Sequence, residues 1–433
     1  MIKKILLTIL LTALIFPIGL RAETQQYFLD GKRATLSTGV LYNPIISGNA
    51  TTWNATEANR QQIFPTAGTL SLLSVELNGT PGANTAYKFT VRKNSATTTL
   101  SVNIQDTATT GADLTNSTSV AKWDTIGYQS VASGTPTARL PRIAMKFTAD
   151  VANESVLLGG GTANAPSNSV VNYAAVVSQG AYRANERFVQ QVVSATGTIK
   201  NFIVKLGTAP GAGNSWQIDF MVNSVSMAST TISGTNTTSS WDGTPFNVIP
   251  GDKISYMTTP TSLPSNTIML FGATFIASID GESLIMGGGI TTPALSGANY
   301  FQLNSMDGTY DSTEVNSQGS GATTTLRNLY VDEENAAGAS KSWTITVRKN
   351  AGNATITCNI ANPNLTCKDI TNSATSTIFG EMNLNIIEGE AAGIPATSTF
   401  AWGLTQFIAP TVQAATTTEE VPRKRILATF LKF

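Results

Sequence analysis

The sequence predicts an all-β protein built from three tandem antiparallel β-sandwich modules. Three times an aromatic residue is followed seven positions later by Asn, and nineteen positions after that by Asp. The three sets are Tyr87, Asn94 and Asp113; Trp216, Asn223 and Asp242; and Trp343, Asn350 and Asp369. The copies are 216 − 87 = 129 and 343 − 216 = 127 residues apart. A period of this length fits a self-contained domain with its own core, and it is too long for a solenoid repeat.

The composition favours strands and turns over helices. Thr, Ser, Asn and Gly supply most of the polarity, and no stretch sustains the apolar period of a helix. Charged residues make up only 12% of the chain and balance to +0. The sequence therefore shows no electrostatic footprint for DNA or RNA, and we expect no nucleic-acid partner.

The first 22 residues predict a signal peptide. Lys3 and Lys4 precede an apolar stretch, residues 5–20, and Ala22 offers a small residue for cleavage. An uncleaved anchor is the alternative, because Leu20 is larger than the residue usually found at the third position back. We expect a secreted or cell-surface protein with no transmembrane span in the mature chain, since no other stretch is long and apolar enough.

The repeat register predicts the module boundaries. The second and third copies open alike, with Glu154-Ser155 and Glu282-Ser283, which are 282 − 154 = 128 residues apart, and each is followed by three glycines. The glycines lack the following Lys-Ser/Thr of a phosphate-binding loop and indicate a module entry. The expected segments are a signal peptide at 1–22, modules at 23–151, 152–280 and 281–409, and a linker with a strand-like tail at 410–433.

Within a module, alternation of apolar and polar residues predicts the strands. In the first copy Phe89 and Val91 fall on one face, while Lys88, Thr90 and Arg92 fall on the other. Further strands are expected at 70–77, 97–104, 125–131 and 142–149, with turn-rich segments between them. Several short strands joined by polar turns are typical of an antiparallel sandwich or jelly roll.

Short motifs carry a family resemblance across the three modules. They are Gly68-Thr69, Pro210 to Gly213, Gly251-Asp252, Val347 to Asn350 and Thr371 to Ser373. This pattern resembles modules of secreted and phage-tail-like jelly-roll proteins, and the module length is similar to that of the tumour necrosis factor-like jelly roll. The resemblance implies jelly-roll-like modules that build assemblies or recognition surfaces, and it names no ligand.

Cys358 and Cys367 predict a disulfide in the third module. They lie nine residues apart around the turn sequence Asn362-Pro363-Asn364. In an oxidising compartment two Cys that flank a short hairpin are most simply a cross-strand disulfide. Uniform spacing places Val102 and Gly111 at these positions in the first copy, and Thr231 and Ser240 in the second. The bond is therefore expected to be a local feature of one module.

The search for reactive groups predicts a protein that is not an enzyme and holds no cofactor. The chain has His 0, which excludes mechanisms that need an imidazole base or ligand. Asp307, Asp311 and Glu314 form a weak calcium candidate. Their aligned positions in the second copy include Gln179 and Arg183, so a solvated acidic loop is the favoured interpretation and no metal is expected.

Two recurrent sets of acids are interpreted as turn residues. They are Asp113, Asp242 and Asp369, and Asp124, Asp252 and Glu381. Short carboxylates among Gly, Thr, Asn and Ser usually accept hydrogen bonds from turn backbone. The recurrent Glu57, Glu186 and Glu314 are expected to hydrogen-bond turns as well. Tyr87, Trp216 and Trp343 are candidates for ligand stacking, with core or rim packing as the favoured alternative.

The C-terminal tail predicts an assembly contact. Arg423-Lys424-Arg425 precedes an apolar ending that contains Ile426, Leu427, Phe430, Leu431 and Phe433. The segment could add as a strand to a neighbouring subunit, touch an anionic surface through its basic cluster, or complete its own third module.

Together these features predict an exported structural or adhesive protein that forms or decorates a filament, sheath or surface layer, with self-association as the expected partnership. The alternative is a protein whose modules bind glycans or another cell-surface partner. A glycosidase with two carboxylates is poorly supported, because the recurrent acids are interpreted as turn residues. The sequence leaves open whether the modules pack about a pseudo-threefold axis or lie in a row.

Overall fold

The computed structural model describes most of the chain. The described residues are 22–31, 34–47, 52–160, 164–178, 180–294, 297–389 and 398–412. One compact unit comprises Glu23–Pro410. A second unit contains Ala22, at the start of β1 (Ala22–Glu23), and β31 (Thr411–Val412). Over the described ranges no helix has the length and apolar character to cross a membrane.

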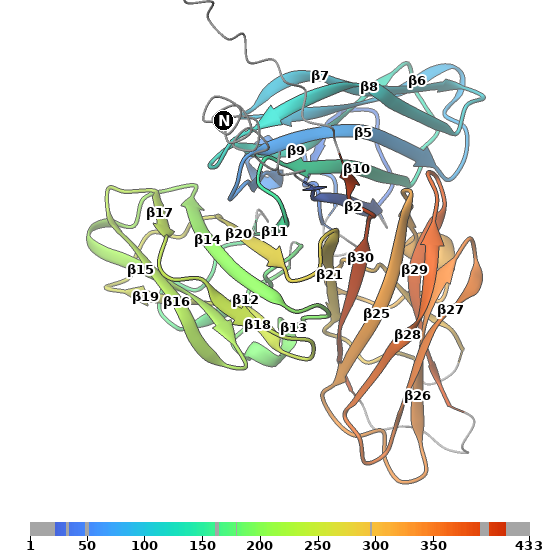
Figure 1. Cartoon of the computed structure of the whole chain (residues 1–433). Coiled ribbons are helices and arrows are strands. Elements are labelled where there is room, and N and C mark those ends of the chain that lie inside the picture. The colour runs from blue at the N-terminus through green and yellow to red at the C-terminus, as the bar shows by residue number, and fades with distance from the viewer. Residues whose placement is uncertain are drawn as a thin grey trace, which may run out of the picture. The chain divides into compact units, whose positions relative to one another are not determined.

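Module 1 consists of two sheets (Figure 1). The first sheet has the order β2 (Gln25–Gly31), β10 (Pro141–Ala149), β5 (Gly68–Leu77) and β8 (Thr110–Val120). The second has β3 (Val40–Asn43), β9 (Thr125–Ser133), β6 (Gly82–Lys93) and β7 (Ala96–Asp106), with β4 (Gln62–Ile63) also paired to β9.

Module 2 repeats the pattern. Its first sheet has β11 (Glu154–Gly160), β20 (Met269–Ala277), β14 (Gly197–Leu206) and β17 (Thr238–Trp241), with β18 (Phe246–Val248) also paired to β14. Its second sheet has β12 (Asn172–Ala174), β19 (Lys253–Thr261), β15 (Gly211–Val222) and β16 (Val225–Gly234), with β13 (Gln191–Val192) also paired to β19.

Module 3 has the same two sheets. The first has β23 (Met306–Gly308), β21 (Glu282–Gly289), β30 (Phe400–Phe407), β25 (Thr324–Glu333) and β28 (Thr366–Ser376). The second has β22 (Asn299–Phe301), β29 (Glu381–Glu388), β26 (Ser342–Lys349) and β27 (Gly352–Ala361), with β24 (Gly319–Ser320) also paired to β29. Short 3-10 helices precede β4, β13 and β24: η2 (Glu57–Arg60), η3 (Glu186–Phe188) and η4 (Glu314–Ser317).

The strand order is the same in all three modules. If the main strands of a module are numbered one to eight along the chain, the first sheet follows 1-8-3-6 and the second follows 2-7-4-5. This is the order produced when a long antiparallel ribbon is wound into a double-sheet jelly roll. Within the modules, β23 pairs with β21 in parallel, and in module 2 a single parallel bridge joins Gly159 of β11 to Ser178. The predicted all-β fold of three sandwich modules is confirmed.

Each module places its apolar residues between its two sheets. In β6 the side chains of Tyr87, Phe89 and Val91 are all fully buried, as the alternation of that strand predicts. Aromatic pairs fill the centres, for example Phe64 with Phe147 in module 1. Hydrophobic burial between the sheets is thus the main stabilising contribution within each module.

Contacts between modules run in a cycle within the unit Glu23–Pro410. The short strand β4 of module 1 contacts β11 and β20 of module 2. In the same way β13 of module 2 contacts β21 and β30 of module 3, and β24 of module 3 contacts β2 and β10 of module 1. Because module 3 also reaches module 1, the contacts are those of a closed pseudo-threefold arrangement and not of a row.

Each junction requires a small residue on strand eight. The equivalent positions are Ala144, Gly272 and Gly403, and Ala144 belongs to the same buried cluster as residues of module 3. A Cβ on Gly272 would lie 2.6 Å from the carbonyl oxygen of Ile63, and one on Gly403 would overlap that of Val192. The backbones of neighbouring modules therefore approach too closely there for a larger side chain.

Candidate functional site

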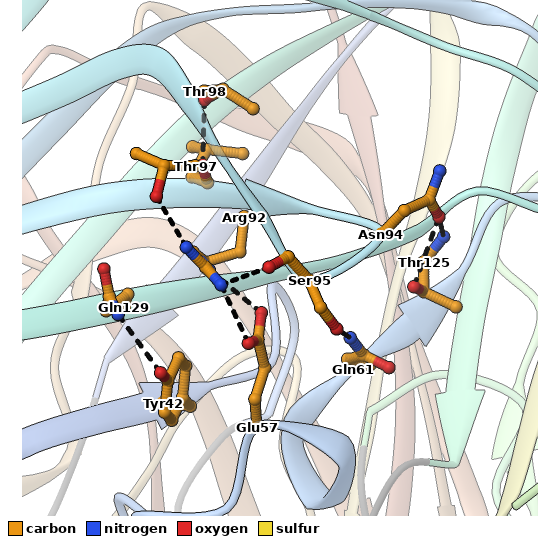
Figure 2. Close-up of polar contacts among 11 residues, drawn as sticks. Tyr42, Glu57, Gln61, Arg92, Asn94, Ser95, Thr97, Thr98, Thr125 and Gln129 are labelled. Carbon is orange, nitrogen blue, oxygen red and sulfur yellow. Dashed lines mark hydrogen bonds and ion pairs between the residues drawn. The ribbon is translucent and has the colours of Figure 1, made fainter.

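The recurrent Asn forms the tight turn of the β6–β7, β15–β16 and β26–β27 hairpins. Asn94, Asn223 and Asn350 have φ of 50°, 50° and 49°, and the residue after each also has positive φ. Two successive residues with positive φ define the hairpin turn that favours Asn at its first position. The Asn94 side-chain oxygen also accepts a hydrogen bond from the Thr125 backbone N–H at 2.8 Å (Figure 2). The spacing signature therefore marks a turn that ties a hairpin to the next strand.

The recurrent Glu makes a paired contact with Arg beside that turn. Figure 2 shows Arg92 donating from Nε and Nη2 to the two Glu57 oxygens, each at 3.0 Å. Arg348 and Glu314 repeat the pair at 2.9 and 2.8 Å. In module 1 the hydrogen bond with Glu57 raises the pKa of Arg92. Such two-point pairs bind strongly, so these side chains serve the fold.

Module 2 keeps the Glu and lacks the Arg. Met221 stands at the position of Arg92, and Glu186 accepts instead a hydrogen bond from the Ser255 hydroxyl at 2.7 Å. The expected hydrogen bonding of the three Glu is thus present, but its donors are side chains and not turn backbone.

Asp113 and Asp369 accept backbone hydrogen bonds as expected, but they do so at the register shift inside β8 and β28 and not in a turn between strands. Asp369 accepts hydrogen bonds from the backbone N–H groups of Thr357, Thr371 and Asn372 at 3.0, 3.1 and 3.0 Å. Burial raises the pKa of Asp369, but the hydrogen bonds from Asn372 and these N–H groups outweigh it and lower the pKa to about 2. Hydrogen bonds likewise lower the pKa of Asp113. These carboxylates are held ionised by the fold.

Asp242 does not occupy the equivalent structural position. Strand pairing places Asp113 opposite Leu73, Asp369 opposite Leu329, and Trp241 opposite Phe202, the counterpart of those two leucines. In module 1, Thr90 pairs with Ser101 and Arg92 pairs with Thr97, so a bulge in β7 holds two extra residues. The bulge in β27 also holds two extra residues, whereas the one in β16 holds one. Module 2 is therefore one residue out of step after its hairpin, and equal sequence spacing misplaces Asp242.

The hydrogen bonds to the turn Asn correct the second set of acids. The N–H that bonds the turn Asn belongs to Thr125, Lys253 and Glu381 in the three modules. Glu381 therefore corresponds to Thr125, and Gly380 stands at the position of Asp124 and Asp252. Those two Asp do accept backbone hydrogen bonds, from Ala121 and Ile249, each at 2.8 Å.

The three aromatic anchors lie in the cores. Tyr87, Trp216 and Trp343 are each 0% exposed. No ring face is open to a ligand, so the interpretation as stacking residues is not supported, and packing describes all three. They lie within strands whose side chains alternate inward and outward, and the anchor position faces inward.

Cys358 and Cys367 form a disulfide. Cys358 lies in β27 and Cys367 in β28, which belong to different sheets of module 3. The bond therefore links the two sheets, and the expectation of a cross-strand bond in one hairpin is wrong. The chain between the two Cys crosses from one sheet to the other instead of reversing within one.

The other modules fill the disulfide position without Cys. In module 2 the structurally equivalent residues are Thr230 and Ser239, whose hydroxyl oxygens lie 2.5 Å apart. Sequence spacing had indicated Thr231 and Ser240, one residue too far. In module 1 the counterparts are Val102 and Gly111, and a Cβ on Gly111 would lie 2.6 Å from the Val102 side chain.

The acidic loop of module 3 does not assemble a cluster of ligands. Asp311 accepts hydrogen bonds from the Thr313 N–H at 2.8 Å and the Asn316 amide at 3.1 Å. Glu314 is paired with Arg348, and the Asp307 side chain lies outside the described residues. Over the described part of the chain, no group of three or more Cys, Asp or Glu side chains could hold a metal ion.

The predicted assembly tail, with Ile426, Leu427, Phe430, Leu431 and Phe433, lies outside the described residues. The same holds for residues 1–21 of the predicted signal peptide.

A charged cluster at the junction of modules 2 and 3 was not anticipated. Arg187 pairs with Asp332 at 2.9 Å, and Lys253 lies 3.6 Å from the same carboxylate. The adjoining Glu333 is 1% exposed. Burial raises the pKa of Glu333 to about 7. The sequence marks 332–334 as acidic, but only the contact between modules brings the cations to it.

Cavities open on the described surface, and two of them adjoin residues discussed above. One, of about 330 Å³, lies at this junction and includes Gly251, Tyr330 and Lys368 in its wall. The other, of about 440 Å³, lies in module 3 beside Asn299 and Tyr310.

Comparison with known proteins adds no family. The chain matches no protein-family model and no curated protein sequence.

Proposed function

We propose that the chain is an exported structural or adhesive protein that forms or decorates an extracellular filament, sheath or surface layer. The observation that carries this proposal is the cyclic contact of three jelly-roll modules within one chain. A closed ring of this kind would suit a building block, because each module contacts two neighbours. The shared strand order also supports the resemblance to tumour necrosis factor-like jelly rolls of secreted and phage-tail-like proteins.

The contacts that the recurrent polar residues make support a role without catalysis. The Asn, Glu and Asp that repeat between modules are taken up by turns and paired contacts within the fold. The chain has no histidine to serve as a base. An enzyme usually concentrates perturbed groups in one cleft, whereas these are spread over three modules.

Two exposed apolar residues recur at equivalent positions and favour an assembly surface. Leu114 in β8 is 59% exposed, and Ile370 in β28 is 51% exposed. Each directly follows the recurrent Asp of its module, since 370 − 114 = 256 and 369 − 113 = 256. One exposed apolar residue needs no explanation, but its recurrence at a corresponding site supports a contact.

Self-association is proposed to use the C-terminal tail. Its apolar ending can add as a strand to the sheet edge of a neighbouring subunit, where backbone groups are unpaired. The test is negative-stain microscopy and sedimentation of the mature chain, residues 23–433, beside a variant that ends at Thr418. The truncated variant should stay folded and lose the assembly.

A matched control separates strand addition from charge. The triple variant Arg423→Gln, Lys424→Gln and Arg425→Gln removes the basic cluster and keeps the apolar ending. It should still assemble. If the truncated protein assembles as well as the mature chain does, strand addition by the tail is wrong; a monomeric mature chain would count against the structural role itself.

The alternative function is glycan binding. Burial of the recurrent aromatics removes the residues that suggested it. A glycan array probed with the mature chain tests this alternative directly, and specific binding there would favour a recognition role over a structural one.

A further inference from the structure

The turn before strand seven carries a residue that differs between the modules. The equivalent positions are Trp123, Gly251 and Phe379, with φ of 81°, 98° and 60°. The equivalence is structural: the Trp123 N–H bonds the Phe64 carbonyl and the Gly251 N–H bonds the Val193 carbonyl, each at 2.9 Å. A bulky residue with positive φ is strained, so an aromatic at two of these positions indicates a compensating contact.

At the junction of modules 1 and 2 that contact is visible. Trp123 packs against a buried cluster formed by Ile63 of its own module with Ile203 and Leu270 of module 2. The indole thus fills the space between the turn of one module and the outer face of the next. Burial of a large aromatic side chain offsets the backbone strain.

At the junction of modules 2 and 3 the same space is open. Gly251 supplies no side chain, and a Cβ built on it would meet no atom within 4 Å. The cavity of about 330 Å³ lies here, with Gly251 and Val192 from module 2 and Tyr330, Asp332, Thr366 and Lys368 from module 3 in its wall. Tyr330 is the counterpart of Ile203, which the Trp123 indole covers at the first junction. The volume is within the range of pockets that hold small molecules.

The charges around the cavity are unequal. Arg187 and Lys253 both approach Asp332, at 2.9 and 3.6 Å. Lys368 is exposed and has no ion-pair partner among the described residues. Arg187 and Lys253 neutralise Asp332, the one carboxylate within the wall. Lys368 is then the wall charge left to attract an anionic group on whatever enters.

We propose that this cavity binds a planar aromatic molecule that carries an anionic group. The ring occupies the place that the Trp123 indole takes at the first junction, above Tyr330, and the anionic group faces Lys368. This site goes beyond the structural role and does not depend on it.

The probes are indole-3-acetate, which has both features, and indole, which lacks the charge. Calorimetric titration of the mature chain should show one site for indole-3-acetate and weaker binding of indole. Gly251→Trp should fill the cavity and abolish binding of both. Gly213→Trp is the matched control, because Gly213 also has positive φ, 77°, and open space around its Cβ, but it lies outside the cavity wall. The control should bind as the unchanged protein does.

A second variant keeps the test independent of the new Trp. Lys368→Glu alters an exposed side chain and should leave the fold intact. It should weaken indole-3-acetate by up to about fivefold and leave indole nearly unchanged, because an exposed charge pair contributes up to such a factor. The proposal is overturned if the unchanged protein binds neither probe at millimolar concentration. It is equally overturned if indole-3-acetate binds and neither Gly251→Trp nor Lys368→Glu weakens it.

Discussion

Replacing Asp369 by Asn should destabilise module 3, and the loss should depend on pH. The carboxylate accepts three backbone hydrogen bonds, at 3.0 to 3.1 Å, and one from the Asn372 amide at 2.9 Å. Asn keeps the shape but turns an NH₂ group toward some of these donors, which leaves them unsatisfied. The substitution therefore tests whether the negative charge is what holds this part of β28 in place.

The magnitude follows from the pKa of Asp369. It falls from 3.8 to about 2 on folding. A tenfold change in proton affinity corresponds to about 1.4 kcal/mol, so the ionised group contributes about 2 kcal/mol. Because the folded pKa is the lower one, this stability is fully present above about pH 4 and is lost as the pH falls through about 2.

The assay is urea unfolding of the mature chain across this pH range, with hydrogen exchange to locate the effect in module 3. Asp242→Asn is the matched control. Its side chain is 52% exposed and pairs with Lys122 at 2.8 Å, so its loss should cost less than about 1 kcal/mol. Equal costs for the two variants at pH 7 would refute the claim that Asp242 is structurally different. A cost for Asp369→Asn that persists undiminished at low pH would refute the electrostatic explanation.

Four further outcomes are expected. Glu333→Gln should stabilise the protein above pH 7 by up to about 3 kcal/mol and have little effect near pH 4. The pKa of Glu333 is raised from 4.5 to about 7, so the stability that the wild-type protein has below pH 4.5 is lost as the pH rises through 7. Melting curves across this pH range check the prediction, and no gain at high pH would contradict it. Replacing both Cys358 and Cys367 by Ser should cost about 2 to 3 kcal/mol and loosen module 3 alone, measured by hydrogen exchange, while free thiols in exported protein by mass spectrometry would argue against the bond. Gly403→Val should lower the melting temperature through a clash with the Val192 carbonyl, whereas Gly207→Val, with 3.6 Å to its nearest neighbour, should not; equal effects would mean that the junction is not tightly packed. Residues 152–280 should fold alone as a β-domain by circular dichroism, and a disordered spectrum would exclude independent modules.

The sequence by itself determined the number of modules and their fold class. Strand alternation acts over a few residues, so the strands and the favoured packing role of the recurrent aromatics could be predicted without a structure. The recurrent Asp was expected to accept hydrogen bonds from nearby backbone, and this is confirmed for Asp113 and Asp369, although both lie at a bulge inside a strand.

The sequence could not determine register where a bulge changes the residue count. Bulges of two residues in β7 and β27 against one in β16 shift every later equivalence in module 2. That is why equal spacing misassigned Asp242, Thr231 and Ser240. The turn sequence between Cys358 and Cys367 also predicted a hairpin there, because a connection that crosses between sheets can contain the same turn residues as one that reverses within a sheet.

Only the tertiary structure decided how the modules meet. The cyclic contacts, the close backbone approach at Gly403 and the cavity beside Gly251 all join residues more than a hundred positions apart or in different modules. A short-range sequence pattern cannot predict such contacts, since a glycine that allows a neighbouring backbone to approach looks the same in sequence as one that forms a turn. The strands of this protein can therefore be predicted from local periodicity, whereas its junctions depend on how whole modules pack against one another.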